Sequence, residues 1–452
     1  MLKTRTEQKI NILGIRGVPE RSGSDILCKR GFYMQTIIYL NYIISFVFTL
    51  CYAYQFFYIF VGLLKKPKEF EAKEDHRYAV VISARNERAV VGQLVESIKA
   101  QNYPEELVDV FVIADNCTDD TAQVARDAGA LVYERTNTEL VGKGYALDWM
   151  FKIIQTEYAD KNYEAYMIFD ADNLLDANYI MEMNKVFDQG YRIITSYRNS
   201  KNFGSNWISS GHSLWFLREA KFLNNARMML NTSCAISGTG FLVSADVIKK
   251  NGGWIHHLLT EDIEFTIDSV IHGETIGYCA NAILYDEQPT KFSQSYTQRL
   301  RWAKGFYQVF ANYGGKLFRG IFKGSFGCFD MLMTISPAML LTLISIFVNA
   351  VAIPVGFLTH DPNAAGLLWA LLQTVVNFYG LFFILGTITT ITEWNQIHCN
   401  KGKRIWNLFT FPFFMLSYIP IAVIALFKKV EWKPINHSVA TTVEEIRGEA
   451  NV

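Results

Sequence analysis

The sequence predicts an α/β domain with a mostly parallel sheet, joined to an α-helical transmembrane bundle. Strand-like and helix-like segments alternate between residues 78 and 290, and acidic side chains follow several of the strands. Long apolar runs lie on both sides of this region. Alternation of this kind is typical of sheets whose parallel strands are connected by helices. The 452 residues are enough for a large soluble core and a membrane part.

The composition argues against two classes of protein. Lys+Arg and Asp+Glu both number 43, so the net charge is near zero. A nucleic-acid-binding protein would normally show a basic excess, so no nucleic-acid partner is expected. The 7 cysteines are scattered and form no Cys-x-x-Cys pair. Neither a zinc ribbon nor a disulfide framework is therefore predicted.

The N-terminal part divides at Met34, which offers a natural start for a membrane protein. Residues 1–33 are polar and basic, and we interpret them as a candidate non-native or disordered extension. Residues 34–66 are predicted to form the N-terminal transmembrane helix, because about 36–64 contain no charge and are long enough for one span. This run is followed by three lysines: Lys65, Lys66 and Lys68. The positive-inside tendency then places the next domain in the cytoplasm.

Residues 67–295 are predicted to form this cytoplasmic domain. Four short segments have the apolar, β-branched character of buried strands: 78–83, 108–114, 130–133 and 165–169. Helical spacing follows three of the strands: 89–100, 121–128 and 145–157. In open parallel sheets, ligands bind at the carboxyl ends of the strands.

Polar side chains follow each predicted strand. In chain order these residues are Arg85, Asn86, Glu87, Asp115, Lys143, Asp170 and Asp172. Alone, an Asp or Asn at such a place most often caps a helix or forms a turn. Together, at one edge of one sheet, the residues indicate a binding site.

The spacing of Asp170 and Asp172 puts two carboxylates within reach of one divalent cation. Mg²⁺ and Mn²⁺ prefer such oxygen ligands and bind through one or two carboxylates plus substrate phosphates. Together with Lys143, the cation would neutralise a departing diphosphate. The sequence contains no Gly-x-x-x-x-Gly-Lys-Ser/Thr motif, which disfavours a P-loop ATPase.

Two later motifs also carry chemistry. Thr260-Glu261-Asp262 places two carboxylates side by side, although the same residues could simply cap a helix. Gln298-Arg299-Leu300-Arg301-Trp302 offers an amide, two guanidiniums and an indole. If this segment is helical, Gln298, Arg301 and Trp302 share one face. The alternative for Trp302 is an anchor at the membrane interface.

The remaining segments are predicted from their apolar and basic patterns. Residues 296–330 suit interfacial helices, and 331–428 are predicted to form a transmembrane bundle, with 429–452 as a C-terminal tail. The bundle has three apolar runs: about 331–358, 367–391 and 405–427. Asn206–Leu230 reads as an amphipathic helix, either at the membrane face or inside the soluble domain. Basic residues after the last run leave the number of true spans and the side of the C-terminus open.

In this order, and between membrane helices, the motifs resemble those of a known family. Asp115, Asp170-Ala171-Asp172, Thr260-Glu261-Asp262 and Gln298–Trp302 resemble the processive, membrane-embedded branch of family 2 glycosyltransferases. This branch includes cellulose, hyaluronan, chitin and poly-N-acetylglucosamine synthases. The resemblance covers about residues 36–432. It implies a GT-A-like nucleotide-sugar transferase domain on the cytoplasmic side of a multi-pass protein of the bacterial cell membrane.

The resemblance also implies residue roles. The catalytic motif would be Thr260, Glu261 and Asp262, with Asp262 as the general base. Nine residues would bind the nucleotide sugar: Arg85, Asn86, Glu87, Asp115, Lys143, Asp170, Gln298, Arg299 and Arg301. Asp172 and Asp170 would hold Mg²⁺ or Mn²⁺. Trp302 would bind the acceptor sugar together with Gly238, Thr239 and Gly240.

The activity implied is inverting, metal-dependent transfer of a hexose from a UDP-sugar to a growing β-linked polysaccharide, coupled to export across the lipid bilayer. UDP-glucose and a β-glucan are the first expectation, and UDP-N-acetylglucosamine the second. Gly238-Thr239-Gly240 departs from the cellulose-type Gly-Thr-Asn, which leaves the sugar open. Two alternatives stand beside this reading: a non-processive transferase acting on a lipid-linked or short glycan acceptor, and, more remotely, a nucleotide-sensing membrane transporter. Accessory subunits cannot be predicted.

Overall fold

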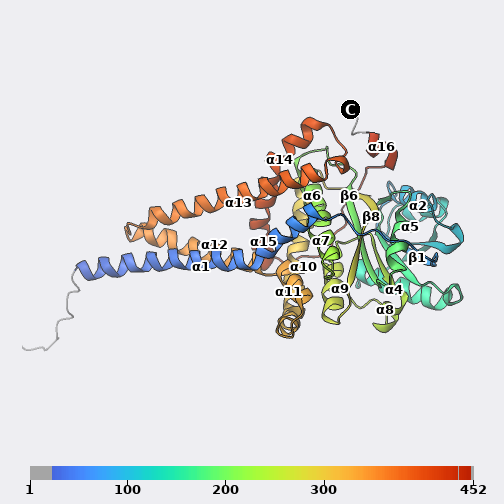
Figure 1. Cartoon of the computed structure of the whole chain (residues 1–452), viewed down its shortest axis with the longest axis horizontal. Helices are drawn as coiled ribbons and strands as arrows, with labels where there is room; N and C mark the ends of the chain where they lie inside the picture. The colour runs from blue at the N-terminus through green and yellow to red at the C-terminus, as the bar shows by residue number, and fades with distance from the viewer. Residues whose placement is uncertain (1–22, 436, 449–452) are drawn as a thin grey trace, which may run out of the picture. The chain divides into compact units, whose positions relative to one another are not determined.

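A computed structural model describes residues 23–435 and 437–448 (Figure 1). The chain forms two compact units. The smaller comprises the residues up to 45 together with 344–373, and the larger comprises 46–343 together with 374–452. All the motif residues singled out above lie in the larger unit.

The smaller unit is built from apolar helix segments. It contains the first part of α1 (Gly23–Leu64), most of α12 (Pro337–Leu358) and the start of α13 (Ala364–Thr392). The side-chain amides of Asn41 and Asn349 donate to each other's oxygens at 3.0 and 2.9 Å. This exchange satisfies two polar groups within apolar stretches of α1 and α12.

The larger unit contains an eight-stranded sheet in the order β3-β2-β1-β4-β7-β6-β8-β5. Its strands are β1 (Tyr78–Ala84), β2 (Val108–Asp115), β3 (Leu131–Arg135), β4 (Ala165–Asp170), β5 (Leu174–Leu175), β6 (Ile193–Ser200), β7 (Phe241–Ser244) and β8 (Ile276–Asp286). The first four in the order are parallel, β7 is antiparallel to both of its neighbours, and β8 is parallel to β6. The predicted mostly parallel α/β fold is confirmed. The strands β5, β6, β7 and β8 were not predicted from the sequence.

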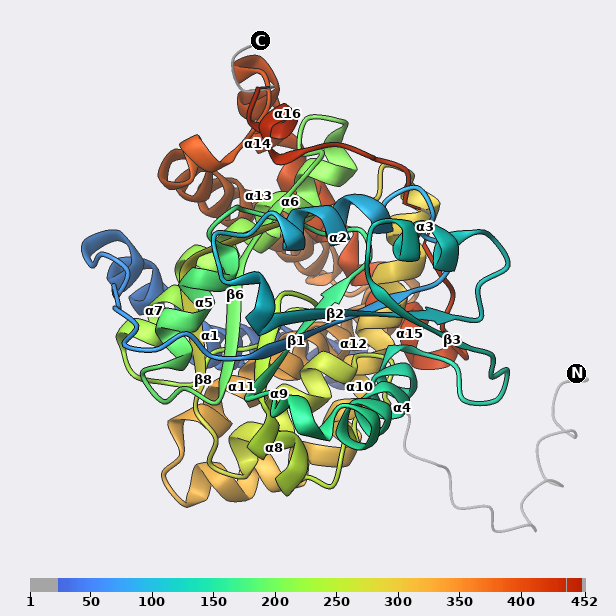
Figure 2. The same cartoon turned by 90° about the vertical axis from the view of Figure 1, so that its right-hand side faces the viewer.

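Helices cover both faces of this sheet. They are α2 (Val91–Lys99), α3 (Thr121–Asp127), α4 (Lys143–Glu157), α5 (Tyr179–Phe187), α8 (Ala245–Lys250) and α9 (Glu261–Ile271). Figure 2 shows α2 and α3 on one side of β1 and β2, with α4, α8 and α9 on the other. Because both faces are covered, nearly every residue of β1 and β4 is buried.

A long helical segment leads away from β6. It consists of α6 (Trp207–Arg218), a π-helical turn (Glu219–Asn224) and α7 (Asn225–Met229). Almost all of its side chains are buried, since α6 packs against β6 and against α14 (Lys401–Leu416). It therefore lacks the solvent-facing side of the amphipathic helix predicted for Asn206–Leu230.

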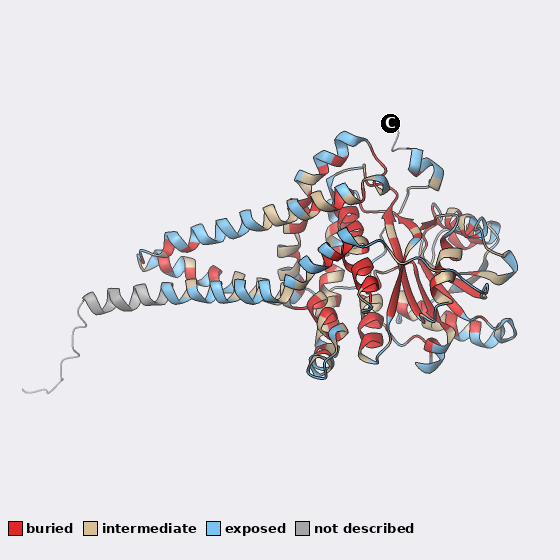
Figure 3. Ribbon diagram, in the orientation of Figure 1, coloured by how far each residue is buried: buried red, intermediate tan, exposed pale blue. Residues whose placement is uncertain are grey.

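The segment predicted as interfacial forms α10 (Phe292–Phe322) and the start of α11 (Phe326–Ile335). α10 packs against α9, α11 and α15 (Tyr418–Phe427). Among the described residues, four helical stretches are long and apolar enough to cross a membrane: Gln35–Leu64, Leu340–Leu358, Ala364–Thr392 and Lys401–Phe427. In Figure 3 the sheet strands are largely buried, whereas long stretches of α1 and α13 are exposed.

Several predicted boundaries change. The apolar run predicted at 331–358 is divided at Ser336, between α11 and α12, and the run at 405–427 is divided at Ser417. Residues 1–22 of the predicted extension lie outside the described residues, and α1 begins at Gly23, before Met34. The C-terminal tail ends its described part in the short helix α16 (Val443–Gly448).

Candidate active site

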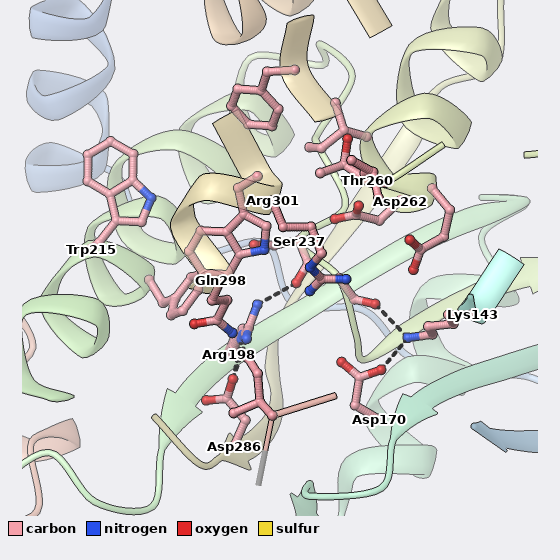
Figure 4. A pocket seen from close by; sticks show the side chains of 18 of the residues that line it. Lys143, Asp170, Arg198, Trp215, Ser237, Thr260, Asp262, Asp286, Gln298 and Arg301 are labelled. Carbon is pink, nitrogen blue, oxygen red and sulfur yellow. Dashed lines mark hydrogen bonds and ion pairs between the residues drawn. The ribbon is translucent and has the colours of Figure 1, made fainter. Parts of the chain in front are cut away.

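A cavity of about 460 Å³ gathers most of the motif residues (Figure 4). The predicted residues that line it are Arg85, Glu87, Asp115, Lys143, Asp170, Asp172, Gly238, Thr260, Glu261, Asp262, Gln298, Arg301 and Trp302. They come from four strand or loop segments and from the helices α4, α9 and α10. In Figure 4, Lys143 and Asp170 lie on one side of the cavity and Trp215 on the other, with Arg198 and Gln298 between them.

The strand ends meet because the strands run in parallel register. Ser83 of β1 pairs with Ile113 of β2 and with Asp170 of β4. Asp115 therefore follows β2 at the same edge as Asp170. Arg135, at the end of β3, donates from Nη1 to Asp115 Oδ1 at 2.5 Å, and both side chains are buried. The Arg135 guanidinium thus neutralises the carboxylate of Asp115, which would be costly to bury without a partner.

Lys143 connects two of the motifs. Its Nζ donates to Asp170 Oδ1 at 2.5 Å and to the carbonyl oxygen of Gly238 at 2.9 Å. Lys143 begins α4 directly after Gly142, whose φ of 132° suits glycine. The ammonium therefore lies beside the first carboxylate of the Asp170–Asp172 pair, as a cation that handles a diphosphate would.

Thr260 is the N-cap residue of α9, so Glu261 and Asp262 occupy its first turn. Burial raises the pKa of Glu261 to about 7, against the opposing effect of Lys143 and Arg301. Burial likewise raises the pKa of Asp262. The helix-start position and a chemical role are compatible, because carboxylates are favoured at helix N-termini. A carboxylate with a raised pKa is suited to accept a proton.

The Gln298–Trp302 segment lies on α10, and its side chains divide between two directions. Gln298, Arg301 and Trp302 line the cavity. The rings of His212 and Phe216 form T-shaped contacts with the indole of Trp302, with ring centroids 5.6 and 6.2 Å from its own. The predicted common face of the helix is thus present in the structure.

Arg299 lies outside the cavity lining formed by the described residues, which differs from its predicted place at the nucleotide. Its Nη1 donates to Ser417 Oγ at 2.6 Å and to the carbonyl oxygen of Phe414 at 3.3 Å. The guanidinium also covers the rings of Phe414 and Tyr418. Arg299 precedes Arg301 by two positions, and that offset turns a helical side chain to another face. Arg299 therefore joins α10 to α14 and α15.

A family model described as "Glycosyltransferase like family 2" matches residues 76–305, about half of the chain. The chain belongs to this family. The match covers the sheet, the Asp170–Asp172 pair, the Thr260–Asp262 motif and the Gln298–Trp302 segment. The family 2 glycosyltransferase reading of the sequence is confirmed.

Curated relatives agree with this assignment at low identity. The chain is similar to "Probable glycosyltransferase YdaM" of Bacillus subtilis (23% over 267 residues; 55% of this chain, 59% of the relative). It is also similar to the beta-monoglucosyldiacylglycerol synthase of Synechocystis sp. (24% over 235 residues; 52% and 48%) and to the poly-beta-1,6-N-acetyl-D-glucosamine synthase of Staphylococcus epidermidis (22% over 261 residues; 56% and 61%). The matches span about half to three fifths of these relatives.

One solved structure supports the fold. The mannosyltransferase PcManGT from Pyrobaculum calidifontis, in complex with GDP-Man and Mn²⁺, matches with a TM-score of 0.55 and 15% identity. The match covers 86% of this chain and 99% of that one. This family 2 domain therefore has the predicted GT-A-type fold.

Three further predicted residues of this family 2 domain lie outside the lining that the described residues form. Asn86 has a φ of 59°, and its Oδ1 accepts from the backbone N–H of Thr118 at 2.8 Å. Thr239 Oγ1 accepts from the N–H of Asp170 at 2.9 Å. Gly240 has a φ of 65°, and a Cβ there would lie 1.8 Å from Leu284. These residues shape the loops that carry the lining side chains.

The structure adds lining residues that sequence reasoning missed: Arg198, Trp215, Glu219, Asp286, Glu287, Trp432 and His437. Among them, Arg198 contacts an acidic side chain, a backbone carbonyl and an aromatic ring. Its Nε donates to Asp286 Oδ2 and its Nη1 to the carbonyl oxygen of Ser237, both at 2.6 Å. It also lies 3.8 Å from the ring centroid of Phe216. Arg198 and Asp286 belong to β6 and β8, which the sequence analysis did not predict, so no motif marked them.

The C-terminal tail contacts the part of the cavity lined by Glu87 and Glu287. His437 Nδ1 lies 2.9 Å from Glu87 Oε1, and the backbone N–H groups of Ser438 and Val439 donate to Glu287 at 2.9 and 2.8 Å. Although burial opposes it, the nearby carboxylates of Asp172 and Glu87 raise the pKa of His437 to about 10. Farther on, Ile446 of α16 is buried. Nothing in the sequence signalled this docking, since it depends on tertiary contacts.

The Asp170–Asp172 pair fits a divalent cation that shares its shell with phosphate oxygens. Asp172 Oδ2 accepts from the N–H of Glu287 at 3.0 Å and lies 3.7 Å from His437 Nε2. Burial opposes it, but His437 and Lys201 hold the pKa of Asp172 below its usual value. Among the described residues, no group of three or more His, Cys, Asp or Glu side chains could hold a metal alone. A site of two carboxylates completed by a diphosphate does not need one.

Proposed function

We propose that this protein extends a β-linked polysaccharide from a UDP-sugar, with inversion at the anomeric carbon, and passes the product toward the bilayer. The observation that supports the proposal is the extent of the cavity. Its lining includes Asp115 and Asp170 at the strand ends, Asp262 and Trp302, and also Tyr418. Tyr418 belongs to the candidate membrane span Lys401–Phe427.

The donor would bind at the strand ends. The uridine would lie near Arg85 and Asp115, with the diphosphate toward Lys143 and Arg301, because guanidinium and ammonium groups suit phosphate oxygens. Asp172 and Asp170 would hold Mg²⁺ or Mn²⁺ there. When bound, the metal offsets the negative charge that develops on the leaving diphosphate.

The acceptor would approach from the side of Trp302, whose indole suits stacking against the C–H face of a sugar. Asp262 would take the proton of the acceptor hydroxyl while the hydroxyl oxygen bonds to the anomeric carbon. The nucleoside diphosphate would depart from the opposite side of that carbon. The α-linked donor would therefore give a β-linked product. A Cβ on Gly238 would lie 3.9 Å from Asp262 Oδ2, so this glycine leaves space beside the base.

A lipid-linked or short glycan acceptor is a second candidate. The lining beyond Trp302 includes the apolar side chains of Leu223, Ala338, Met415 and Ala422. The chain is also similar to proteins named beta-monoglucosyldiacylglycerol synthase. In both candidates the enzyme would lie in the cell membrane with its family 2 domain on the cytoplasmic side, where Lys65, Lys66 and Lys68 follow the first span.

The test is nucleotide release and product analysis with the purified full chain in detergent. The donors are UDP-glucose, UDP-N-acetylglucosamine and GDP-mannose, each with Mn²⁺ and again with EDTA. We expect Mn²⁺-dependent release of UDP and a long β-linked polymer, whose linkage methylation analysis would define. A product with one added sugar would favour the second candidate. Release from GDP-mannose alone, or full activity in EDTA, would contradict the proposed donor and metal.

A further inference from the structure

The helical segment from α6 to α7 presents one stripe of side chains to the cavity. Trp215, Glu219, Leu223 and Arg227 follow one another at intervals of four residues, and all line it. Glu219 and Leu223 belong to the π-helical turn Glu219–Asn224. Single π-helical turns inside α-helices are rare and frequently occur at functional sites.

The surroundings of Glu219 disfavour the ionised form of its carboxyl. Burial raises the pKa of its carboxyl, against the opposing effect of Arg227 and Arg198. Its neighbours Trp215 and Leu223 are largely apolar. The side chain is half-buried, and a carboxyl partly removed from water is costly unless polar groups satisfy it. Glu219 lines the same cavity as Ser237, Gly238 and Asp262, so its carboxyl borders the space next to Asp262.

The nearby arginines have stronger partners, so Glu219 is not needed to neutralise them. Arg227 donates from Nε and Nη2 to Asp330 at 2.8 Å each. Arg198 donates to Asp286 at 2.6 Å. Within the described part of the chain, no ion pair of Glu219 is within 4.0 Å, whereas both arginines have one.

We infer that Glu219 binds a hydroxyl group of the acceptor and that the acceptor is a glycan, not an acyl chain. Resting on the proposed function, this names the acceptor class of the same site. Figure 4 shows Trp215, one turn before Glu219, across the cavity from Lys143 and Asp170. That is the side away from the donor. A sugar hydroxyl can donate to the carboxyl, whereas an acyl chain would bury it without a partner.

The test compares acceptors with the full chain and its Glu219→Leu and Glu219→Gln variants. Nucleotide release from the UDP-sugar is measured alone, with cello- and chito-oligosaccharides, and with diacylglycerol in mixed micelles. We expect the glycans to stimulate the unaltered protein. The kcat/KM for the glycan should fall about ten- to hundredfold in Glu219→Leu, mainly through KM, and less in Glu219→Gln, which keeps a hydrogen-bonding group.

Two controls separate this role from folding. Lys221→Gln lies on the same π-helical turn but outside the described cavity lining, and it should keep the glycan stimulation. Melting temperature and UDP affinity by calorimetry report on folding and the donor site. Equal glycan stimulation in Glu219→Leu, or stimulation by diacylglycerol alone, would overturn the inference. No nucleotide release by the unaltered protein would overturn the proposed function as well.

Discussion

Gly305 of α10 lies against the side chain of Thr260 at the start of α9. A Cβ on Gly305 would come within 2.4 Å of Thr260 Oγ1 and 2.5 Å of its Cγ2. Gly305 follows Arg301 by one helical turn, so this close approach brings the Gln298–Trp302 face next to Glu261 and Asp262. Because Gly305 has no side chain, α10 can pack closely against the start of α9, which sets the distance between the two motifs.

Gly305→Ala should therefore push α10 away from α9. Overpacking of this kind costs about 1–3 kcal/mol, or is relieved by a backbone shift. We expect a clear drop in kcat with UDP binding retained, measured by nucleotide release and calorimetry. Gly315→Ala is the matched control, because a Cβ there meets nothing within 4 Å on the same helix. Equal activity of both variants would contradict the spacing role.

Asp262→Asn tests the proposed base. The amide keeps the size of the side chain but cannot accept the acceptor proton, so transfer should fall about 10²–10⁴-fold. UDP affinity, measured by calorimetry with Mn²⁺, should stay close to that of the unaltered protein. Asp246→Asn, at an exposed position of α8, serves as the control. Transfer retained in Asp262→Asn would remove this residue from the role of base.

The pH dependence follows from the raised pKa values of Glu261 and Asp262. The base is useful only when ionised, and protons bind to the pair as the pH falls, so kcat/KM should decline below about pH 7, where the pKa of Glu261 lies. The two carboxyls titrate together. Glu261→Gln removes a neighbouring negative charge, and the acidic limb should then move to lower pH. If the acidic limb of the kcat/KM profile of Glu261→Gln lay at the same pH, the titrations of Glu261 and Asp262 would not be coupled.

Trp302→Ala should impair use of the acceptor more than folding. The indole lines the cavity and is partly exposed, and the rings of His212 and Phe216 form T-shaped contacts with it. We expect shorter products and at least a tenfold higher KM for a glycan acceptor, since the substitution removes the indole face on which the sugar would stack. Trp302→Phe should recover part of this loss. Products of unchanged length in Trp302→Ala would favour a purely structural role.

The features predicted best are those with a local signal. β1 was expected at 78–83 and runs from Tyr78 to Ala84, because a short β-branched run is a strong strand signal. The meeting of Asp115 and Asp170 followed from parallel register alone. The shared face of Gln298, Arg301 and Trp302 followed from helical periodicity.

The features missed depend on contacts between distant segments. β6 ends in Arg198, Asn199 and Ser200, and its buried polar side chains conceal the strand pattern. Arg299 stands inside a motif, and helical spacing turns it away from the face of Arg301, but its contacts with Phe414 and Ser417 could not be predicted from the sequence. His437 reaches the cavity only because the tail docks on Glu87 and Glu287. Such placements are set by tertiary packing, which overrides local preference.

A buried ion pair joins the helix after the π-helical turn to α11. Asp330 accepts two hydrogen bonds of 2.8 Å from Arg227 and one of 2.8 Å from each of the hydroxyls of Tyr54 and Tyr58. Asp330 and Arg227 are almost completely buried. Tyr54 and Tyr58 belong to α1. The carboxylate therefore connects three helices of the larger unit through charged and neutral hydrogen bonds.

Asp330→Asn should destabilise the protein strongly, because it leaves the Arg227 charge buried without a counter-charge. Breaking a buried pair in this way costs about 3–5 kcal/mol. The melting temperature in detergent should fall well below that of Asp246→Asn, the exposed control. Replacing both partners, as Arg227→Met with Asp330→Leu, should recover much of the loss, since no charge is then buried. If the double variant melted no higher than Asp330→Asn, the hydrogen bonds to Tyr54 and Tyr58, and not the charge pair, would hold these helices together.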